Sequence, residues 1–367
     1  MHLELVIPAL FAAQDLRPAS LPALEMLLAR SRRTNGQAAN LETWLCRGFG
    51  LCELSAENPA IPAGALTAHA HGLEPVGLGP GAHVWLRADP VHLRPDRDRV
   101  LLMPGRALGV TAAEAEGLAA ALTPLLAGKF ALHAVRPDQW CLQVEGQGQS
   151  EAGTRPPVDL AGANIDPHLP PKAWHPLLTE IQMALYEHQA NTARERRGDP
   201  VINSVWLWGA GKLPAAAGGP WQSVSAQDPI AIGLARLAGM RHRTTGAGAM
   251  DWLGRAPEDG RHLVVLDGLR GVHALGDLEA LARRLQELES NWFAPLLAAL
   301  KARRIGMLTI HVPEAAASFE TVRGDLRRFW RRPRPLSAYL STNAVVARSG
   351  KIGQRWLNNS NTKSSRQ

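Results

Sequence analysis

Short apolar runs alternate with helical segments through the second half of the chain, and this alternation constrains the fold more than any other feature. Residues 201–208, 262–267 and 305–311 are apolar runs of strand length. Apolar residues recur at three- and four-residue steps over 230–237 and 278–288, which is the spacing of one helix face. Strands that alternate with helices favour an α/β body built on a mostly parallel sheet.

Residues 82–165 follow a second pattern, which predicts a small domain of their own. Two strand-like runs precede a helix that opens with a capping box of Thr111 and Glu114, and two more strand-like runs follow it. The order strand–strand–helix–strand–strand can fold as a small α+β unit. The α/β body is then discontinuous and comprises residues 1–81 and 166–340.

The formal net charge of +7 belongs to the last part of the chain. From Thr321 to Gln367 there are 11 Lys and Arg residues against one Asp, whereas the remaining 320 residues hold 29 basic and 32 acidic residues. The body is slightly acidic, so the basic balance of the whole chain is no evidence for a body that binds nucleic acid. Residues 341–367 are polar, basic and without periodicity, which predicts a disordered tail.

A cluster of basic and aromatic residues precedes this tail. Its members are Arg327, Arg328, Phe329, Trp330, Arg331, Arg332 and Arg334. Such a cluster can bind RNA, DNA or anionic lipid, or it can simply be a solvated terminal face.

Composition excludes several classes of protein. The chain has 46% hydrophobic and 20% charged residues, which places it among globular proteins. No apolar run reaches the roughly 18–20 residues of a membrane-spanning helix. The first residues lack the basic segment of a signal peptide, which favours a soluble, cytoplasmic protein. Cys46, Cys52 and Cys141 form no Cys-x-x-Cys pair, which argues against a disulfide framework or a structural zinc site.

Candidate ligand-binding residues gather beside two predicted strands. Arginine offers a planar fork to phosphate or carboxylate, asparagine offers a donor and an acceptor, and a glycine pair lets an anion approach backbone N–H groups. The candidates are Arg87, Asp89, His92, His188, Asn191, Arg194, Asn203, Gly209 and Gly211. The alternative is that these residues serve the fold, as a core histidine, helix-capping arginines, a local ion pair and a tight turn.

Several stretches of the sequence resemble a known family. They are His188–Arg194 (HQANTAR), Gly198–Asn203 (GDPVIN), the strand ending in Gly209-Ala210-Gly211, Arg87–Leu93 (RADPVHL) and Glu180–Met183 (EIQM). The pattern resembles the archaeal-type, cofactor-independent phosphoglycerate mutases. Over residues 1 to about 335 it more closely resembles the RpfE-type bacterial regulatory proteins. This resemblance implies an alkaline-phosphatase-like body, with helices on both faces of its sheet, interrupted by a small inserted domain.

In the enzymes that it resembles, a serine is transiently phosphorylated beside two divalent metals, usually manganese or zinc. The sequence departs from that pattern where the nucleophile and the metal ligands belong. The departures are Pro8-Ala9 in place of an Asp, no Ser-Asp pair within 31–58, Leu269 or Arg270 in place of a carboxylate, and Thr309-Ile310-His311 without its Asp. Two histidines without carboxylates coordinate a divalent ion poorly, so no metal or other cofactor is expected.

We therefore predict a non-catalytic, phosphoglycerate-mutase-like regulatory protein. It would bind a phosphorylated or carboxylated metabolite in a cleft between the two domains, and its protein partner is not specified by the sequence. Two alternatives stay open. One is a metal-dependent phosphoglycerate mutase or phosphatase with a rewired site, whose manganese or zinc would be held by His273, His311, Asp267 and Asp277. The other is an interaction protein that binds nucleic acid or an acidic partner through its basic tail.

Overall fold

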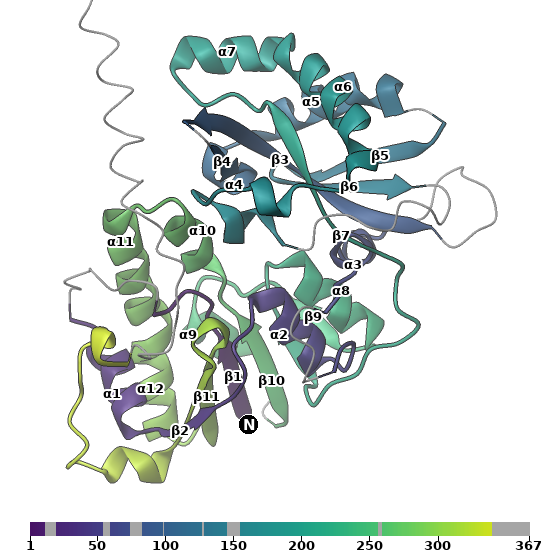
Figure 1. The fold of residues 1–367 in the computed structure, drawn as a ribbon. Helices are drawn as coiled ribbons and strands as arrows, with labels where there is room; N and C mark the ends of the chain where they lie inside the picture. The colour runs from purple at the N-terminus through teal and green to yellow at the C-terminus, as the bar shows by residue number, and fades with distance from the viewer. Residues whose placement is uncertain are drawn as a thin grey trace, which may run out of the picture. The chain divides into compact units, whose positions relative to one another are not determined.

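Seven strands form a sheet that is mostly parallel, which confirms the predicted α/β class (Figure 1). In order across the sheet the strands are β2 (Arg32–Asn35), β12 (Ala317–Val322), β11 (Met307–Val312), β1 (His2–Val6), β10 (Arg261–Val265), β8 (Ser223–Ser225) and β9 (Arg241–Arg243). The five strands from β11 to β9 run parallel, whereas β12 and β2 join one edge in antiparallel pairs.

The computed structural model describes residues 1–11, 20–53, 59–73, 83–97, 99–126, 128–144, 155–255 and 259–339. The predicted tail at 341–367 lies outside the described residues. Within them, no helix is long and apolar enough to cross a membrane.

Helices cover both faces of the seven-stranded sheet. Leu3 and Leu5 of β1 point into a large core with the apolar side chains of helices on one face. Glu4 points to the opposite face, where His311 packs against Trp44 with ring centroids 5.0 Å apart. The helices of this unit are α1 (Pro22–Arg30), α2 (Leu41–Gly48), α8 (Pro229–Leu237), α9 (Ala249–Arg255), α10 (Gly268–Ala274), α11 (Leu278–Leu288) and α12 (Ala294–Lys301).

A second, antiparallel sheet belongs to a separate unit. Its strands are β4 (Arg99–Pro104), β3 (Val84–Asp96), β6 (Gln139–Val144) and β5 (Phe130–Arg136), and β7 (Ser204–Gly211) also pairs with β3. Its helices are α3 (Ala63–Ala70), α4 (Gly105–Leu108), α5 (Ala112–Leu126), α6 (His175–Tyr186) and α7 (Gln189–Arg197). Leu118, Leu122 and Trp140 share a core with Ile181 and Leu185 of α6.

The two units divide the chain differently from the prediction. The described residues of the first unit lie within 1–57, 216–273 and 277–348, and those of the second lie mainly within 58–215. The predicted insertion at 82–165 is part of this second unit. The unit extends further because β7 pairs antiparallel with β3 and because α6 packs on α5. The strand at 201–208, which we assigned to the parallel sheet, therefore belongs to the antiparallel one.

Helix α3 lies unusually close to strand β3. A Cβ atom added at Gly64 would stand 2.5 Å from the backbone N, Cα and C atoms of Leu86. A backbone cannot yield as a flexible side chain can, so only glycine permits this approach. The close packing of α3 on the sheet therefore depends on Gly64.

We expect Gly64→Ala to destabilise the second unit by about 1–3 kcal/mol, because the new methyl group overpacks against the strand backbone. Gly254→Ala is the matched control, since a Cβ at that helical glycine meets nothing within 4 Å. Alanine lowers the conformational entropy of the unfolded chain, so Gly254→Ala should raise the free energy of unfolding by about 0.4–1 kcal/mol. Urea unfolding, with hydrogen exchange of β3 and β10 to separate the units, measures both changes. Equal effects at the two positions would contradict the close approach.

Candidate functional site

Polar side chains gather where parallel strands of the first unit end. Asp228 follows β8 and Asp267 follows β10, and these strands are neighbours in the sheet. Ligands of open α/β sheets bind at the carboxyl ends of the strands. This edge is therefore the candidate functional site, and we name it the carboxyl edge.

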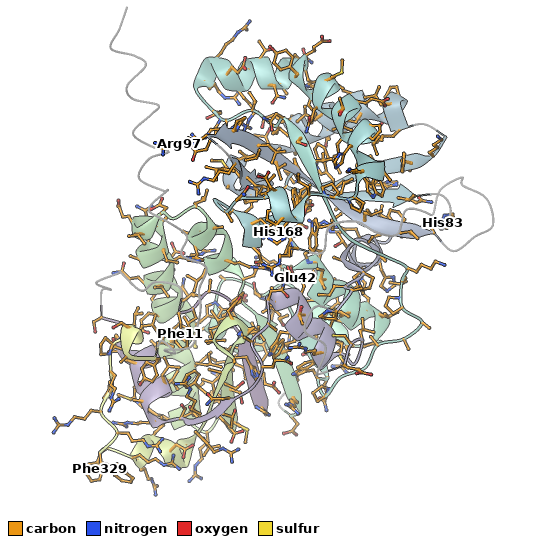
Figure 2. The ribbon with its side chains drawn as sticks, in the orientation of Figure 1. Phe11, Glu42, His83, Arg97, His168 and Phe329 are labelled. Carbon is orange, nitrogen blue, oxygen red and sulfur yellow. The ribbon has the colours of Figure 1, made fainter. Side chains whose placement is uncertain are left out.

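A buried ion pair stands at the carboxyl edge. Glu42 lies in the first turn of α2 (labelled in Figure 2), and Arg270 lies in α10. The two terminal nitrogens of the Arg270 guanidinium donate to the two carboxylate oxygens of Glu42 at 2.7 and 2.9 Å. The side chains are only 10% and 5% exposed, so this bidentate bond is shielded from water.

Asp228 shares the surroundings of this pair. Its carboxylate caps α8 by accepting from the backbone N–H of Ala231 at 2.9 Å. Burial, together with the nearby negative charges of Asp267 and Glu42, raises the pKa of Asp228 to about 6, against the opposing effect of Arg270. The carboxyl edge thus combines three carboxyl groups with one buried guanidinium.

A small cavity opens beside Asp267. Its volume is about 210 Å³, and it lies between the ends of the strands and α11. Its polar lining consists of Gln227, Thr245, Asp267, Arg284, Glu287 and Asn291. Trp292, which is buried, also lines it. Pockets for drug-sized ligands have volumes of about 300–1,000 Å³, so this smaller cavity suits a small polar molecule.

Both ring nitrogens of His311 already have hydrogen-bond partners, on the sheet face to which Glu4 points. Its Nε2 lies 2.9 Å from a carboxylate oxygen of Glu4, and its Nδ1 lies 2.8 Å from the Ser318 hydroxyl. Burial alone would raise the pKa of Glu4, but hydrogen bonds with His311 and Arg261 outweigh it and lower the pKa to about 2. Glu4 is therefore an ionised group inside the sheet, and both nitrogens of His311 already have partners.

The metal ligands suggested for the enzyme alternative do not come together. Asp277 caps α11 by accepting from the N–H of Ala280 at 2.9 Å, and burial lowers the pKa of His273 without a charged partner contributing. Among the described residues, no group of three or more His, Cys, Asp or Glu side chains can hold a metal ion. The set His273, His311, Asp267 and Asp277 is therefore not gathered into one group in the described part of the chain, and its role as a metal site stays a prediction.

Three predicted ligand-binding residues lie in the second unit, where they bond within the fold. Arg87 and Asp89 are 4% and 3% exposed, and Nη2 of Arg87 lies 2.6 Å from Asp89. The indole N–H of Trp208 donates to Asp89 at 2.8 Å, and the Arg87 guanidinium stacks over the Trp208 ring. Nδ1 of His92 lies 2.9 Å from the carbonyl of Val201. These contacts serve the β3–β7 pairing.

The predicted residues on α7 and β7 also bond to neighbouring backbone. The side-chain amide of Asn191 donates to the carbonyls of Leu185 and Ile202 at 2.6 and 2.8 Å. It thereby links the end of α6 to the segment that precedes β7. Arg194 is 1% exposed, and it donates to Glu114 at 2.9 Å and to the carbonyl of Pro200 at 2.8 Å.

His188 and Asn203 complete this set. The Nδ1 of His188 accepts from the N–H of Ala190 and so caps α7. Asn203 forms two 2.8 Å hydrogen bonds with the backbone of Leu93. Their predicted binding role stays a prediction beside these structural roles.

Gly209 and Gly211 lie against the start of α3. A Cβ atom at Gly209, whose φ is +61°, would stand 2.4 Å from Cβ of Ala63. A Cβ atom at Gly211 would stand 2.6 Å from Cβ of Pro62. The glycine pair therefore permits the close approach of α3, and anion binding at these backbone N–H groups stays a prediction.

Sequence reasoning missed Glu42 and the cavity residues Gln227, Thr245, Arg284 and Asn291. Glu42 looked like an ordinary acidic residue in the first turn of a helix. It gains its importance only from Arg270, which is 228 positions away in the chain. No local pattern in the sequence could have joined the two.

Comparison with known proteins gives a partial likeness. No family model matches the chain. A stretch of 146 residues, 39% of this chain, is 30% identical to a probable 2,3-bisphosphoglycerate-independent phosphoglycerate mutase of Geobacter sulfurreducens. That match covers 36% of the relative. The chain therefore has partial sequence similarity to a phosphoglycerate mutase, over about a third of that protein's length.

Two solved structures are similar over most of the chain. The PH0037 protein from Pyrococcus horikoshii has 13% sequence identity and a TM-score of 0.49, with 88% of this chain and 87% of that chain covered. The cofactor-independent phosphoglycerate mutase from Thermoplasma acidophilum has 16% identity and a TM-score of 0.42, with 93% and 95% covered. Both TM-scores lie below 0.5, so neither likeness decides anything about the site.

We expect Arg270→Met to destabilise the first unit by about 3–5 kcal/mol, because it leaves the Glu42 carboxylate buried without its guanidinium. The double variant Glu42→Leu/Arg270→Met should recover most of the loss, since it removes both charges. Hydrogen exchange of β1 and β10 during urea unfolding measures this. A double variant that loses as much as the sum of its single variants would show that the two side chains are not coupled.

The raised pKa of Asp228 predicts a pH dependence of stability. The folded state holds this proton more tightly than the unfolded state, so the first unit should lose stability as pH rises from about 4 to about 6. Asp228→Asn keeps a good capping residue and removes the charge. At pH 7.5 it should be more stable than the parent by on the order of 2 kcal/mol, and the difference should vanish near pH 4. A variant less stable at pH 7.5 would contradict the repulsion.

Proposed function

We propose that this protein is a non-catalytic relative of the phosphoglycerate mutases, of the RpfE regulatory type. It binds a small phosphorylated or carboxylated metabolite at the carboxyl edge of its first unit. The partial similarity to a phosphoglycerate mutase supports the relationship, and an alkaline-phosphatase-like class of fold is part of the same proposal. The mostly parallel sheet, with its carboxyl edge open to a cavity, is compatible with it.

The buried bidentate pair of Arg270 and Glu42 carries this proposal. The resemblance implies manganese or zinc in the catalytic relatives, and such ions need several carboxylate or histidine ligands around one point. At the carboxyl edge a permanent cation, the Arg270 guanidinium, already satisfies both oxygens of Glu42. A divalent ion would be repelled by that charge. The residues present therefore do not fit a two-metal centre, and we assign no step to one.

The cavity beside Asp267 supplies the ligand contacts. Arg284 is the cation in its lining, and its guanidinium packs within about 3.1 Å of where a Cβ atom of Gly268 would stand. It would hold a phosphate or carboxylate group. Gln227, Thr245 and Asn291 offer hydrogen bonds, and Asp267 would accept from a ligand hydroxyl. The lining also holds a second carboxylate, Glu287, which accepts from Arg284 at 2.5 Å, so an anionic ligand would share that guanidinium with it. We propose a small hydroxylated acid or its phosphate as the ligand of this combination of one cation, two carboxylates and several neutral polar groups.

A thermal-shift panel on the full-length protein tests the proposal. It uses 3-phosphoglycerate, 2-phosphoglycerate and inorganic phosphate, each with and without manganese. A ligand at 100 times its dissociation constant stabilises by about 2.7 kcal/mol, so we expect a rise of a few degrees that does not need manganese. Interconversion of the two phosphoglycerates should stay at the level of the buffer, with or without manganese. Manganese-dependent turnover would instead favour the metal-dependent mutase or phosphatase.

Substitutions at two neighbouring arginines of α11 test where the ligand binds. Arg284→Gln removes the cation of the cavity, whereas Arg283→Gln removes a cation that pairs with Glu279 outside it. Both side chains are more than half exposed, so neither change should unfold the helix. We expect Arg284→Gln to abolish the ligand-induced shift and Arg283→Gln to leave it intact. Equal shifts in both variants would place the ligand elsewhere and refute the cavity.

A further inference from the structure

The first unit has a second groove, whose lining residues are distinct from those of the cavity at the carboxyl edge. We propose that this groove binds single-stranded nucleic acid. Five arginines line a cavity of about 440 Å³, together with the rings of Phe319 and Tyr339. The arginines are Arg32, Arg33, Arg328, Arg331 and Arg334, and we name this surface the arginine groove.

Two segments from opposite ends of the chain form the arginine groove. Arg32 and Arg33 belong to β2, which is the edge strand of the seven-stranded sheet and pairs with β12. The other three arginines follow β12 in the chain. Arg331 donates to the carbonyl of Ser31 at 2.7 Å, and Arg30 donates to the carbonyl of Leu326. These bonds hold the segments together, so the positive charges converge on one surface.

Much of this positive charge is available to an anion. Arg32 pairs with Glu320, and Arg328 pairs with Asp325. By contrast, Arg33 and Arg331 donate to neutral acceptors, and the described residues that line the groove include no carboxylate. Guanidinium groups bind phosphate as planar forks. A repeating phosphate backbone would contact several of them at once.

An exposed aromatic pair beside the groove favours a nucleic acid strand over a small phosphate. Phe329 and Trp330 lie between Arg328 and Arg331 in the chain, and they are 79% and 66% exposed (Figure 2 labels Phe329). Their ring centroids are 5.3 Å apart. Bases of a single strand stack on such rings in a sequence-tolerant manner, whereas a duplex hides the base faces. Arginines with adjacent aromatic side chains are the usual composition of strand-binding surfaces.

The charge of the rest of the chain agrees with a local site. The 320 residues before Thr321 carry three more acidic than basic residues, so the excess positive charge of the chain lies in the part that supplies three of the five groove arginines. A concave, arginine-lined surface suits a flexible strand, which can follow it. A flat membrane surface would contact the rim alone. We therefore infer that the ligand is a single strand of nucleic acid, and the experiments below also measure binding to lipid vesicles.

Fluorescence anisotropy of the full-length protein tests this inference with a labelled 12-residue oligouridine at 50 and 200 mM NaCl. We expect Arg33→Gln/Arg334→Gln to weaken binding at least tenfold and to lower its salt dependence. Lys351→Gln/Arg355→Gln removes the same charge from the basic residues of 341–367 and should change binding less than threefold. Equal losses in the two double variants would overturn the groove as the site. A thermal scan shows whether the groove variant stays folded.

Substitution of Trp330 separates stacking from charge. Trp330→Ala should weaken oligouridine binding about tenfold without changing the salt dependence, and Trp330→Phe should restore most of it. Duplex RNA should bind more weakly than the single strand. Unchanged binding by Trp330→Ala would overturn the strand proposal. So would binding to phosphatidylserine vesicles or inorganic polyphosphate in the absence of oligouridine binding.

Discussion

The chemistry of the first unit depends on one buried ion pair, between Glu42 and Arg270. Two charges taken out of water are tolerated only when each satisfies the other, and the bidentate geometry meets this requirement. The pair ties α2 to α10 beside the end of β10. It also places a permanent cation where Asp228 and Asp267 would otherwise repel each other without compensation. The arginine thus performs electrostatically what a bound cation would do at such an edge.

The second unit uses buried polar groups for a different purpose. Arg87, Asp89 and Trp208 cross-link β3 to β7, and Arg194 ties α7 to the start of α5 through Glu114. Burial raises the pKa of Asp89, while Arg87 and Trp208 oppose that effect. These residues have the types expected of a phosphate site, yet their hydrogen bonds are made within the fold. Residue type alone did not distinguish a binding arginine from an architectural one.

Local patterns predicted the elements better than their assembly. The apolar runs at 262–267 and 305–311 became β10 and β11 of the parallel sheet, and the capping box of Thr111 and Glu114 opens α5. The run at 201–208 was also a strand, but it joined the antiparallel sheet. An apolar strand with helices beside it fits either sheet. Its partner is chosen by the complementary side chains of β3, which lie more than a hundred residues away.

By itself, the sequence determined the α/β class, the places where strands and helices form, and the concentration of basic charge near the end of the chain. Periodicity, capping residues and net charge are local or additive properties, and they can be read without knowing the fold. Tertiary structure decided which carboxylates surround Arg270, which arginines converge on one groove, and which predicted ligand residues bond within the fold. Each of these depends on contacts between segments that are distant in the chain. Such contacts are set by packing and by the satisfaction of buried polar groups, which no short stretch of sequence encodes.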